Sequence, residues 1–185
     1  MMIESISKHG LRAALLTAVA AVFALPSLQV ADAHGKKHIL TTDLGGFEET
    51  PSTLSRTGSG EFRAVVNKER TSFEYSLKFR DLEGTVTQAH IHFGARGLNG
   101  GISIWLCGTT TNPGPAGTPD CGGPNAGSAT RTVTAAEVGG PAGQGIAPGE
   151  FEEILDAMDS GVAYANVHSS KYGGGEIRGQ IRDRD

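Results

Sequence analysis

Three histidines have the spacing and the neighbours of metal ligands. His90 and His92 form a His-x-His pair in an alternating segment, so both imidazoles lie on one face of a strand. Two imidazoles about 6.5 to 7 Å apart along one strand can converge on a single ion. His168 ends another alternating segment, and a third imidazole from a neighbouring strand would complete a set suited to copper or zinc.

The same histidines also fit a purely structural role, in which they hydrogen-bond loop backbone and fix a connection over the sheet. The other motifs of catalysis are missing from the sequence. It contains no Gly-x-Ser-x-Gly elbow, no phosphate-cradling loop with a lysine and no His-Glu-x-x-His helix. We therefore expect a binding site rather than a catalytic one.

Residues 1–33 have the layout of a secretory signal peptide. A weakly positive start precedes an apolar run over 13–25, and the Ala-Asp-Ala triplet at 31–33 supplies the small residues that a signal peptidase reads. As a helix, the apolar run spans only about 20 Å, whereas a bilayer core is about 30 Å thick. An uncleaved anchor is the alternative. The sequence predicts cleavage after Ala33, a secreted or periplasmic protein, and no stable membrane anchor after cleavage.

Cleavage at that position would give the mature chain a special first residue. His34 would carry a free amine beside its imidazole, which together form a bidentate chelate for copper. With one further histidine this arrangement resembles the histidine brace of copper oxygenases and periplasmic copper carriers. In the alternative interpretation, His34 is a frayed terminal residue without a role.

Export also determines how the two cysteines are interpreted. Cys107 and Cys121 form an even pair in an oxidising compartment, which predicts a disulfide. The segment between them is rich in turn-forming residues and has no hydrophobic anchor of its own. A bridge that closes a loop of about 15 residues stabilises by roughly 3 kcal/mol on the chain-entropy model.

The elements that must position these residues are mostly short strands. Apolar and polar residues alternate with a period of two in six segments, which is the pattern of half-buried strands. These segments are 61–66, 73–79, 86–93, 101–107, 162–168 and 176–182. Apolar residues at helical spacing predict one short helix over 150–160, and residues 108–149 are expected to form a long loop. Such elements favour an antiparallel sandwich or a Greek-key barrel.

Composition agrees with one all-β domain and excludes several classes of protein. The chain has 185 residues, of which 27 are glycine and 38% are hydrophobic, with a formal net charge of −4. The apolar content is too high for full disorder. The glycines follow no three-residue period, which excludes collagen. The mild acidity argues against nucleic acid as a partner, because nucleic-acid binders normally carry a basic face.

Two motifs resemble those of the CHRD domain, a family named after chordin. The first is the run Ala-His-Ile-His-Phe-Gly at 89–94 with the glycine-rich segment that follows, and the second is Gly-Gly-Glu-Ile-Arg-Gly-Gln at 174–180. The resemblance covers about residues 38–183. It departs at Gly101 and Gly173, where the family often has proline.

The resemblance implies an immunoglobulin-like β-sandwich or barrel and a secreted bacterial member of the family. It implies no well-established catalytic activity. Five polar residues of the motifs are expected to be structural, with the arginine donating to loop carbonyls or a carboxylate. These residues are Asn99, Asn166, Glu176, Arg178 and Gln180.

The expected organisation is a signal peptide at 1–33, a polar leader at 34–57 and a β-domain at 58–185. The leading functional hypothesis is an exported, non-enzymatic binding domain whose outward-facing histidines bind copper or zinc. The first alternative is a metal-free module that binds an extracellular or periplasmic protein or polymer. The second is a copper redox enzyme, because a His-x-His strand under a long loop resembles copper–zinc superoxide dismutase. That resemblance is weak, since residues 108–149 contain no histidine.

Overall fold

The computed structural model describes residues 37–55 and 58–184. Its secondary structure is dominated by β-strands, with one α-helix and three short 3-10 helices. The strands are β1 (Ile39–Gly45), β2 (Ser59–Val66), β3 (Phe73–Arg80), β4 (Val86–Phe93), β5 (Gly101–Cys107), β6 (Gly127–Val133), β7 (Ala163–Ser169), β8 (Ile177–Gln180) and β9 (Arg182–Asp183). The helices are α1 (Phe151–Asp159), η1 (Gly46–Glu48), η2 (Ala135–Glu137) and η3 (Ala142–Gln144). The predicted signal peptide and His34 lie outside the described residues.

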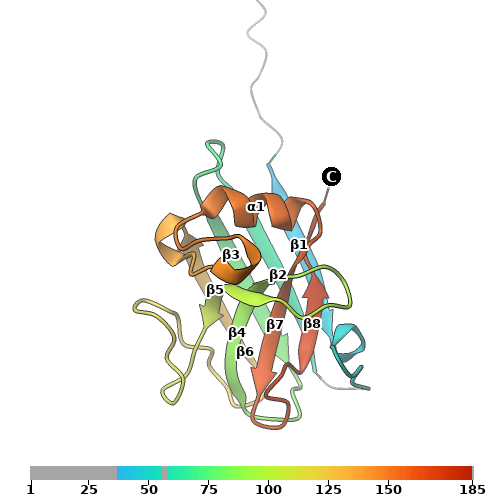
Figure 1. Ribbon diagram of the computed structural model, residues 1–185. Coiled ribbons are helices and arrows are strands. Elements are labelled where there is room, and N and C mark those ends of the chain that lie inside the picture. The colour runs from blue at the N-terminus through green and yellow to red at the C-terminus, as the bar shows by residue number, and fades with distance from the viewer. Residues whose placement is uncertain (1–36, 56–57, 185) are drawn as a thin grey trace, which may run out of the picture. The chain divides into compact units, whose positions relative to one another are not determined.

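The strands form a single antiparallel sheet in the order β5-β4-β7-β8-β1-β2-β3-β6, with β9 paired to β1. The two ends of this order, β5 and β6, also contact each other, so the sheet is nearly closed into a barrel. Figure 1 shows the strands in this arrangement, with α1 across one end of them. The predicted all-β antiparallel fold with one short helix is confirmed.

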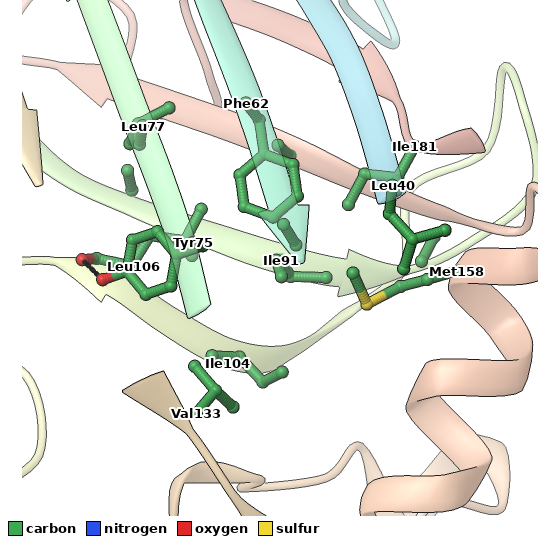
Figure 2. Close-up of a cluster of buried hydrophobic side chains, with 14 of the residues drawn as sticks. Leu40, Phe62, Tyr75, Leu77, Ile91, Ile104, Leu106, Val133, Met158 and Ile181 are labelled. Atoms are coloured by element: carbon green, nitrogen blue, oxygen red, sulfur yellow. Dashed lines mark hydrogen bonds between the residues drawn. The ribbon is translucent and has the colours of Figure 1, made fainter. Parts of the chain in front are cut away.

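Inward-facing apolar side chains from nearly every strand fill the interior. Figure 2 shows Phe62, Tyr75 and Ile91 within this core, and each is at most 1% exposed. The hydroxyl of Tyr75 donates a hydrogen bond to the carbonyl of Leu106, so the polar end of this buried side chain has a partner. One face of the strands therefore packs into the core, and the opposite face carries the polar residues.

Helix α1 covers the core with one apolar stripe. Phe151, Ile154 and Leu155 are buried together with Met158, while the acidic residues between them face outward. The helix ends at Asp159, and Gly161 follows with a φ of 70°, a conformation that favours glycine. The structure thus confirms the predicted helix to within one residue at each end.

The expectation of a loop over residues 108–149 is wrong in part, because strand β6 lies within it. Its segment Gly-Ser-Ala-Thr-Arg-Thr-Val pairs with β3 from Phe73 to Phe79. Only Ala129 and Val133 of this strand are buried apolar residues, so the hydrophobic alternation is weak. The threonines carry the strand preference instead, since β-branched residues suit a pleated surface.

Strand β1 lies within residues 34–57, the segment described above as a polar leader. It pairs with β2 from Ile39 to Gly45, and its Leu40 and Leu44 enter the core. The sheet therefore includes part of that segment. Thr41 and Asp43 lie on the other face of the strand, and Thr42 lies between the two leucines on their own face.

The predicted disulfide is confirmed, with Cys107 at the end of β5 joined to Cys121 in the loop that follows. Both cysteines are fully buried. The bond closes the glycine- and proline-rich loop against the sheet. Within the described residues, no helix has the length and hydropathy needed to cross a membrane.

Candidate metal centre

Strands β4 and β7 bring the three predicted ligands together. They are antiparallel neighbours, and His90 lies opposite Asn166 while Gln88 lies opposite His168. His90 and His168 are therefore diagonal partners on the same face of the sheet. His92 is two residues further along β4 on that face. We call His90, His92 and His168 the imidazole cluster.

The three rings of the imidazole cluster contact one another. Ring centroids are 5.3 Å apart for His90 and His92, 5.0 Å for His90 and His168, and 5.9 Å for His92 and His168. One nitrogen from each ring lies within 4.8 Å of the other two nitrogens. The rings of His90 and His92 are thus closer together than the spacing of about 6.5 to 7 Å along the strand that the sequence alone predicts.

The expectation that these histidines face outward is correct only in that they lie opposite the hydrophobic core. They are buried, with exposed fractions of 0% for His90, 8% for His92 and 5% for His168. Loops from distant parts of the chain cover this face of the sheet. A site expected at the solvent-facing surface is therefore enclosed.

Backbone carbonyls hold two of the rings and fix their tautomers. The Nδ1 atom of His92 lies 2.9 Å from the carbonyl oxygen of Gly100, and that of His168 lies 3.0 Å from that of Gly173. Because a carbonyl only accepts, both Nδ1 atoms must carry the proton and both Nε2 atoms present a lone pair. Metal-binding histidines commonly have their second nitrogen held in this way.

The remaining proton in the imidazole cluster belongs to His90. Its Nδ1 lies 3.2 Å from the Nε2 of His168 and donates to that lone pair. The Nε2 atoms of His90 and His92 are then lone pairs, and both are buried without a hydrogen-bond partner. Buried polar atoms without a partner are costly, and a cation would satisfy them.

Burial keeps the imidazole cluster uncharged. It lowers the pKa of His90 to about 2, with further lowering from His168 and His92 nearby. It lowers the pKa of His92 to about 4, against the opposing effect of the hydrogen bond to Gly100. Burial also lowers the pKa of His168. All three rings are neutral at pH 7, which is the form that binds metals.

A stack of two side chains supports His92. The ring of Tyr164 lies parallel to that of His92, with an interplanar angle of 3° and centroids 4.8 Å apart. The guanidinium of Arg178 lies 3.4 Å from the centre of the Tyr164 ring, within cation–π range. The hydroxyl of Tyr164 accepts a hydrogen bond from the backbone N–H of Gly100. Gly100 thus contacts both members of the aromatic pair.

Arg178 also fastens the loop that follows β4. Its Nη2 donates to the carbonyl of Leu98 at 2.9 Å, and its Nη1 donates to Thr50 Oγ1 at 2.7 Å and to Asn99 Oδ1 at 3.4 Å. Although it carries a charge, Arg178 is only 2% exposed. Gln180 completes the attachment, since its amide donates to the carbonyls of Gly94, Gly161 and Ala163.

Two buried carboxylates adjoin the same polar face. Glu176 accepts hydrogen bonds from the backbone N–H groups of Glu83 and Gly84. Glu49 accepts from the amide of Asn166 at 2.6 Å. Burial raises the pKa of Glu49 to about 7, although the hydrogen bond from Asn166 and the charge of Arg178 oppose the rise. Glu49 is thus partly protonated at neutral pH.

A second group of possible metal ligands lies elsewhere in the described residues. We call His38, Asp159 and Asp183 the carboxylate cluster, because two of its three ligand atoms are carboxylate oxygens. His38 Nε2 is 2.7 Å from Asp159, and Arg70 binds the other oxygen of Asp159 at 3.1 Å. A guanidinium therefore already occupies the position of a cation there.

Comparison with protein-family models matches the chain to the CHRD domain over residues 40–181. The chain belongs to the CHRD domain family. The matched region begins in β1 and ends after β8, so it includes the whole imidazole cluster and the Arg178 network. Searches among curated proteins and among solved structures each give no significant match.

Sequence reasoning identified the three histidines of this CHRD domain but not all of their surroundings. Glu49 and Thr50, which contact the polar face, lie in the segment interpreted as a leader, and no local pattern distinguishes them. The sequence also points to the motif residues Asn166 and Arg178, but Glu49, which accepts from Asn166, is 117 residues away, and Leu98, which accepts from Arg178, is 80 residues away. Those partners become neighbours only when the sheet forms.

Proposed function

We propose that this CHRD domain is an exported, non-enzymatic binding domain that holds one copper or zinc ion at His90, His92 and His168. One observation carries the proposal. Three neutral imidazoles lie within contact of one another, and the Nε2 atoms of His90 and His92 are buried without a partner. The Nε2 of His168 accepts from His90 in the metal-free protein, so it would exchange that hydrogen bond for the ion. Membership of the CHRD family supports an extracellular binding module. Export rests on the predicted signal peptide.

The chemistry of the donors favours copper and zinc over other cations. Imidazole nitrogen suits both ions, whereas calcium and magnesium require oxygen ligands. The carbonyls of Gly100 and Gly173 play the part of the outer hydrogen-bond partners that orient metal-bound histidines. No protein carboxylate belongs to the imidazole cluster, so three neutral ligands would leave a bound ion with its full charge.

Metal content of the purified protein tests the proposal. After reconstitution with Cu²⁺ or Zn²⁺ and removal of loose metal, we expect about one ion per chain by mass spectrometry. His90→Ala/His92→Ala should reduce this to background, because it removes two of the three ligands. His38→Ala is the matched control, since it removes a ligand of the carboxylate cluster, and it should keep the ion.

Two outcomes would count against the proposal in different ways. Absence of bound metal in the unmodified protein would exclude a metal site and leave the histidines with a structural role. Metal retained by His90→Ala/His92→Ala but lost from His38→Ala would place the site at the carboxylate cluster. Thermal unfolding of each variant, measured with and without metal, separates loss of the site from loss of the fold.

Fluorescence gives an independent measurement of the same event. Trp105 is the only tryptophan in the chain, and its ring centroid lies 4.4 Å from that of His90. Cu²⁺ bound to His90 should quench its emission strongly, because a paramagnetic ion so close removes the excited state efficiently. Zn²⁺ should shift the emission with little quenching. A Cu²⁺ titration without quenching would contradict binding at the imidazole cluster.

A metal-free interaction module is the second candidate, and one surface feature favours it. Phe47 and Leu98 are 73% and 62% exposed, and they lie on the two loops that Arg178 holds together. An ion pair of 3.1 Å between Arg96 and Glu48 also joins these loops. Phe47→Ser/Leu98→Ser should abolish binding to an extracellular or periplasmic protein or polymer without changing metal content, and unchanged binding would exclude this surface.

A further inference from the structure

Trp105 lies between the imidazole cluster and the surface. It is the cross-strand partner of His90 on β5, and the two rings meet edge to face at an interplanar angle of 82°. Gly114, in the disulfide-closed loop, lies against the indole so closely that a Cβ there would be 2.6 Å from a ring carbon. Trp105 is nevertheless only half-buried. The side chain thus extends from a buried imidazole to solvent.

The outer end of Trp105 lines a surface cleft of about 300 Å³. Its lining includes Pro115 and Thr118 of the disulfide-closed loop together with Glu137 and Gly139. Arg131 and Glu137 are paired across 2.8 Å, so these two side chains together add no net formal charge. The cleft is large enough for a small molecule and is open to solvent.

Tyr164, the other aromatic side chain in contact with the imidazole cluster in the described residues, has no such exposure. It stacks on His92, but it is only 3% exposed and is covered by Arg178. The three imidazoles are themselves at most 8% exposed. A molecule in solution therefore cannot contact a metal ion at this site directly, and the shortest aromatic route to it runs through Trp105 and His90.

We propose that Trp105 carries electrons between a copper ion at the imidazole cluster and a small one-electron donor in the Trp105 cleft. The inference rests on the proposed function and adds a redox path to it. One electron leaves the donor, which is oxidised by one unit, and reduces Cu²⁺ to Cu⁺. No bond to copper or Trp105 forms or breaks, Trp105 is unchanged at the end, and a donor such as ascorbate releases its proton to solvent. Electron transfer through protein slows steeply with distance, so a contacting aromatic ring on the path raises its rate.

The test measures the rate of copper reduction in loaded protein. Copper content and the paramagnetic resonance spectrum of Cu²⁺ are recorded first, and reduction is then followed by stopped flow. Ascorbate and hexaammineruthenium(II) serve as donors of opposite charge, which controls for electrostatic attraction. We expect Trp105→Leu to slow reduction by both donors at least tenfold with unchanged copper content and spectrum. Trp105→Phe should give an intermediate rate, and Tyr172→Phe, on the exposed turn beside Glu83, should have no effect.

The possible failures can be told apart. An unmodified protein that holds no copper overturns the proposed function and this inference together. Copper held normally in Trp105→Leu, with reduction as fast as in the unmodified protein, overturns the inference alone. Equal slowing in Trp105→Leu and in Tyr172→Phe would also overturn the inference, because the effect would then not be specific to Trp105.

Discussion

The CHRD domain holds two groups of histidine-containing ligands that differ in how their hydrogen bonds are satisfied. In the carboxylate cluster, His38 Nε2 meets Asp159 at 2.7 Å, and the guanidinium of Arg70 binds Asp156 and Asp159. In the imidazole cluster there is no carboxylate, and two buried nitrogens have no partner. The first group has its hydrogen bonds satisfied, whereas the second has two buried nitrogen lone pairs without a hydrogen-bond partner.

The position of each group explains this difference. Asp156 and Asp159 lie in the last turn of α1, where the helix dipole disfavours negative charge, and the helix has no basic residue there. Arg70 supplies the missing positive charge from the turn before β3. The imidazole cluster instead lies under loops, where charged histidines would be costly. Proximity of ligand atoms alone therefore does not distinguish the two groups, whereas buried nitrogen lone pairs without a partner do.

Substitution of Arg178, beside the imidazole cluster, should change the free energy of unfolding more than substitution of Arg70, beside the carboxylate cluster. Arg178→Gln is expected to lower the free energy of unfolding by about 2 to 3 kcal/mol, because the hydroxyl of Thr50 and the carbonyl of Leu98 lose a charged hydrogen-bond donor. Arg178→Lys should recover only part of this loss, because an ammonium cannot replace the planar guanidinium over Tyr164. Urea denaturation measures both. A loss below about 1 kcal/mol for Arg178→Gln would make the buried network no more important than a surface pair.

Acid should destabilise the metal-free protein through the imidazole cluster. The unfolded chain binds protons on histidine below pH 6.5, whereas folded His92 stays neutral to about pH 4 and His90 to about pH 2. Stability is therefore full above pH 6.5 and falls as the pH drops, by about 1.4 kcal/mol per pH unit for each histidine. Denaturation between pH 7 and 5 measures this slope.

Glu49 changes the free energy of unfolding with pH in the opposite direction to the histidines, so its contribution must be measured separately. Its raised pKa makes the folded state bind an additional proton between about pH 4.5 and 7, so this group stabilises as the pH falls. The measurement should therefore be made in Glu49→Gln as well, where the slope should be steeper. A slope that is flat in Glu49→Gln would show that the buried histidines are not held neutral.

The smallest effect is expected in the carboxylate cluster. Arg70→Gln should lower the free energy of unfolding by about 0 to 1 kcal/mol, because Arg70 and Asp156 are well exposed and solvent screens their attraction. High salt should reduce even this difference. A loss as large as that for Arg178→Gln, measured under the same conditions, would remove the distinction between the two regions.

Much of the fold could be predicted because strand alternation and helix spacing are local. The pattern of β3, with Phe73, Tyr75, Leu77 and Phe79 directed inward, is visible in eight consecutive residues. Strand β6 was missed because only two of its side chains are buried apolar residues. Its place in the sheet depends on pairing with β3, more than 40 residues earlier in the chain, which no local window contains.

For the candidate site, the sequence by itself determined which residues share a face. The His-x-His spacing puts His90 and His92 on the same side of β4, and the pattern of β7 does the same for His168, because side chains alternate along any strand. The cysteine pair and the family motifs can likewise be identified from the sequence alone.

Only the tertiary structure decided that these histidines meet and are buried. His90 and His168 are 78 residues apart in the chain, and Glu49 and Asn166 are 117 apart. Their contacts, and the loops that Arg178 holds over them, follow from the pairing of β4, β7 and β8. Burial then makes the imidazoles neutral, because removal from water disfavours charge.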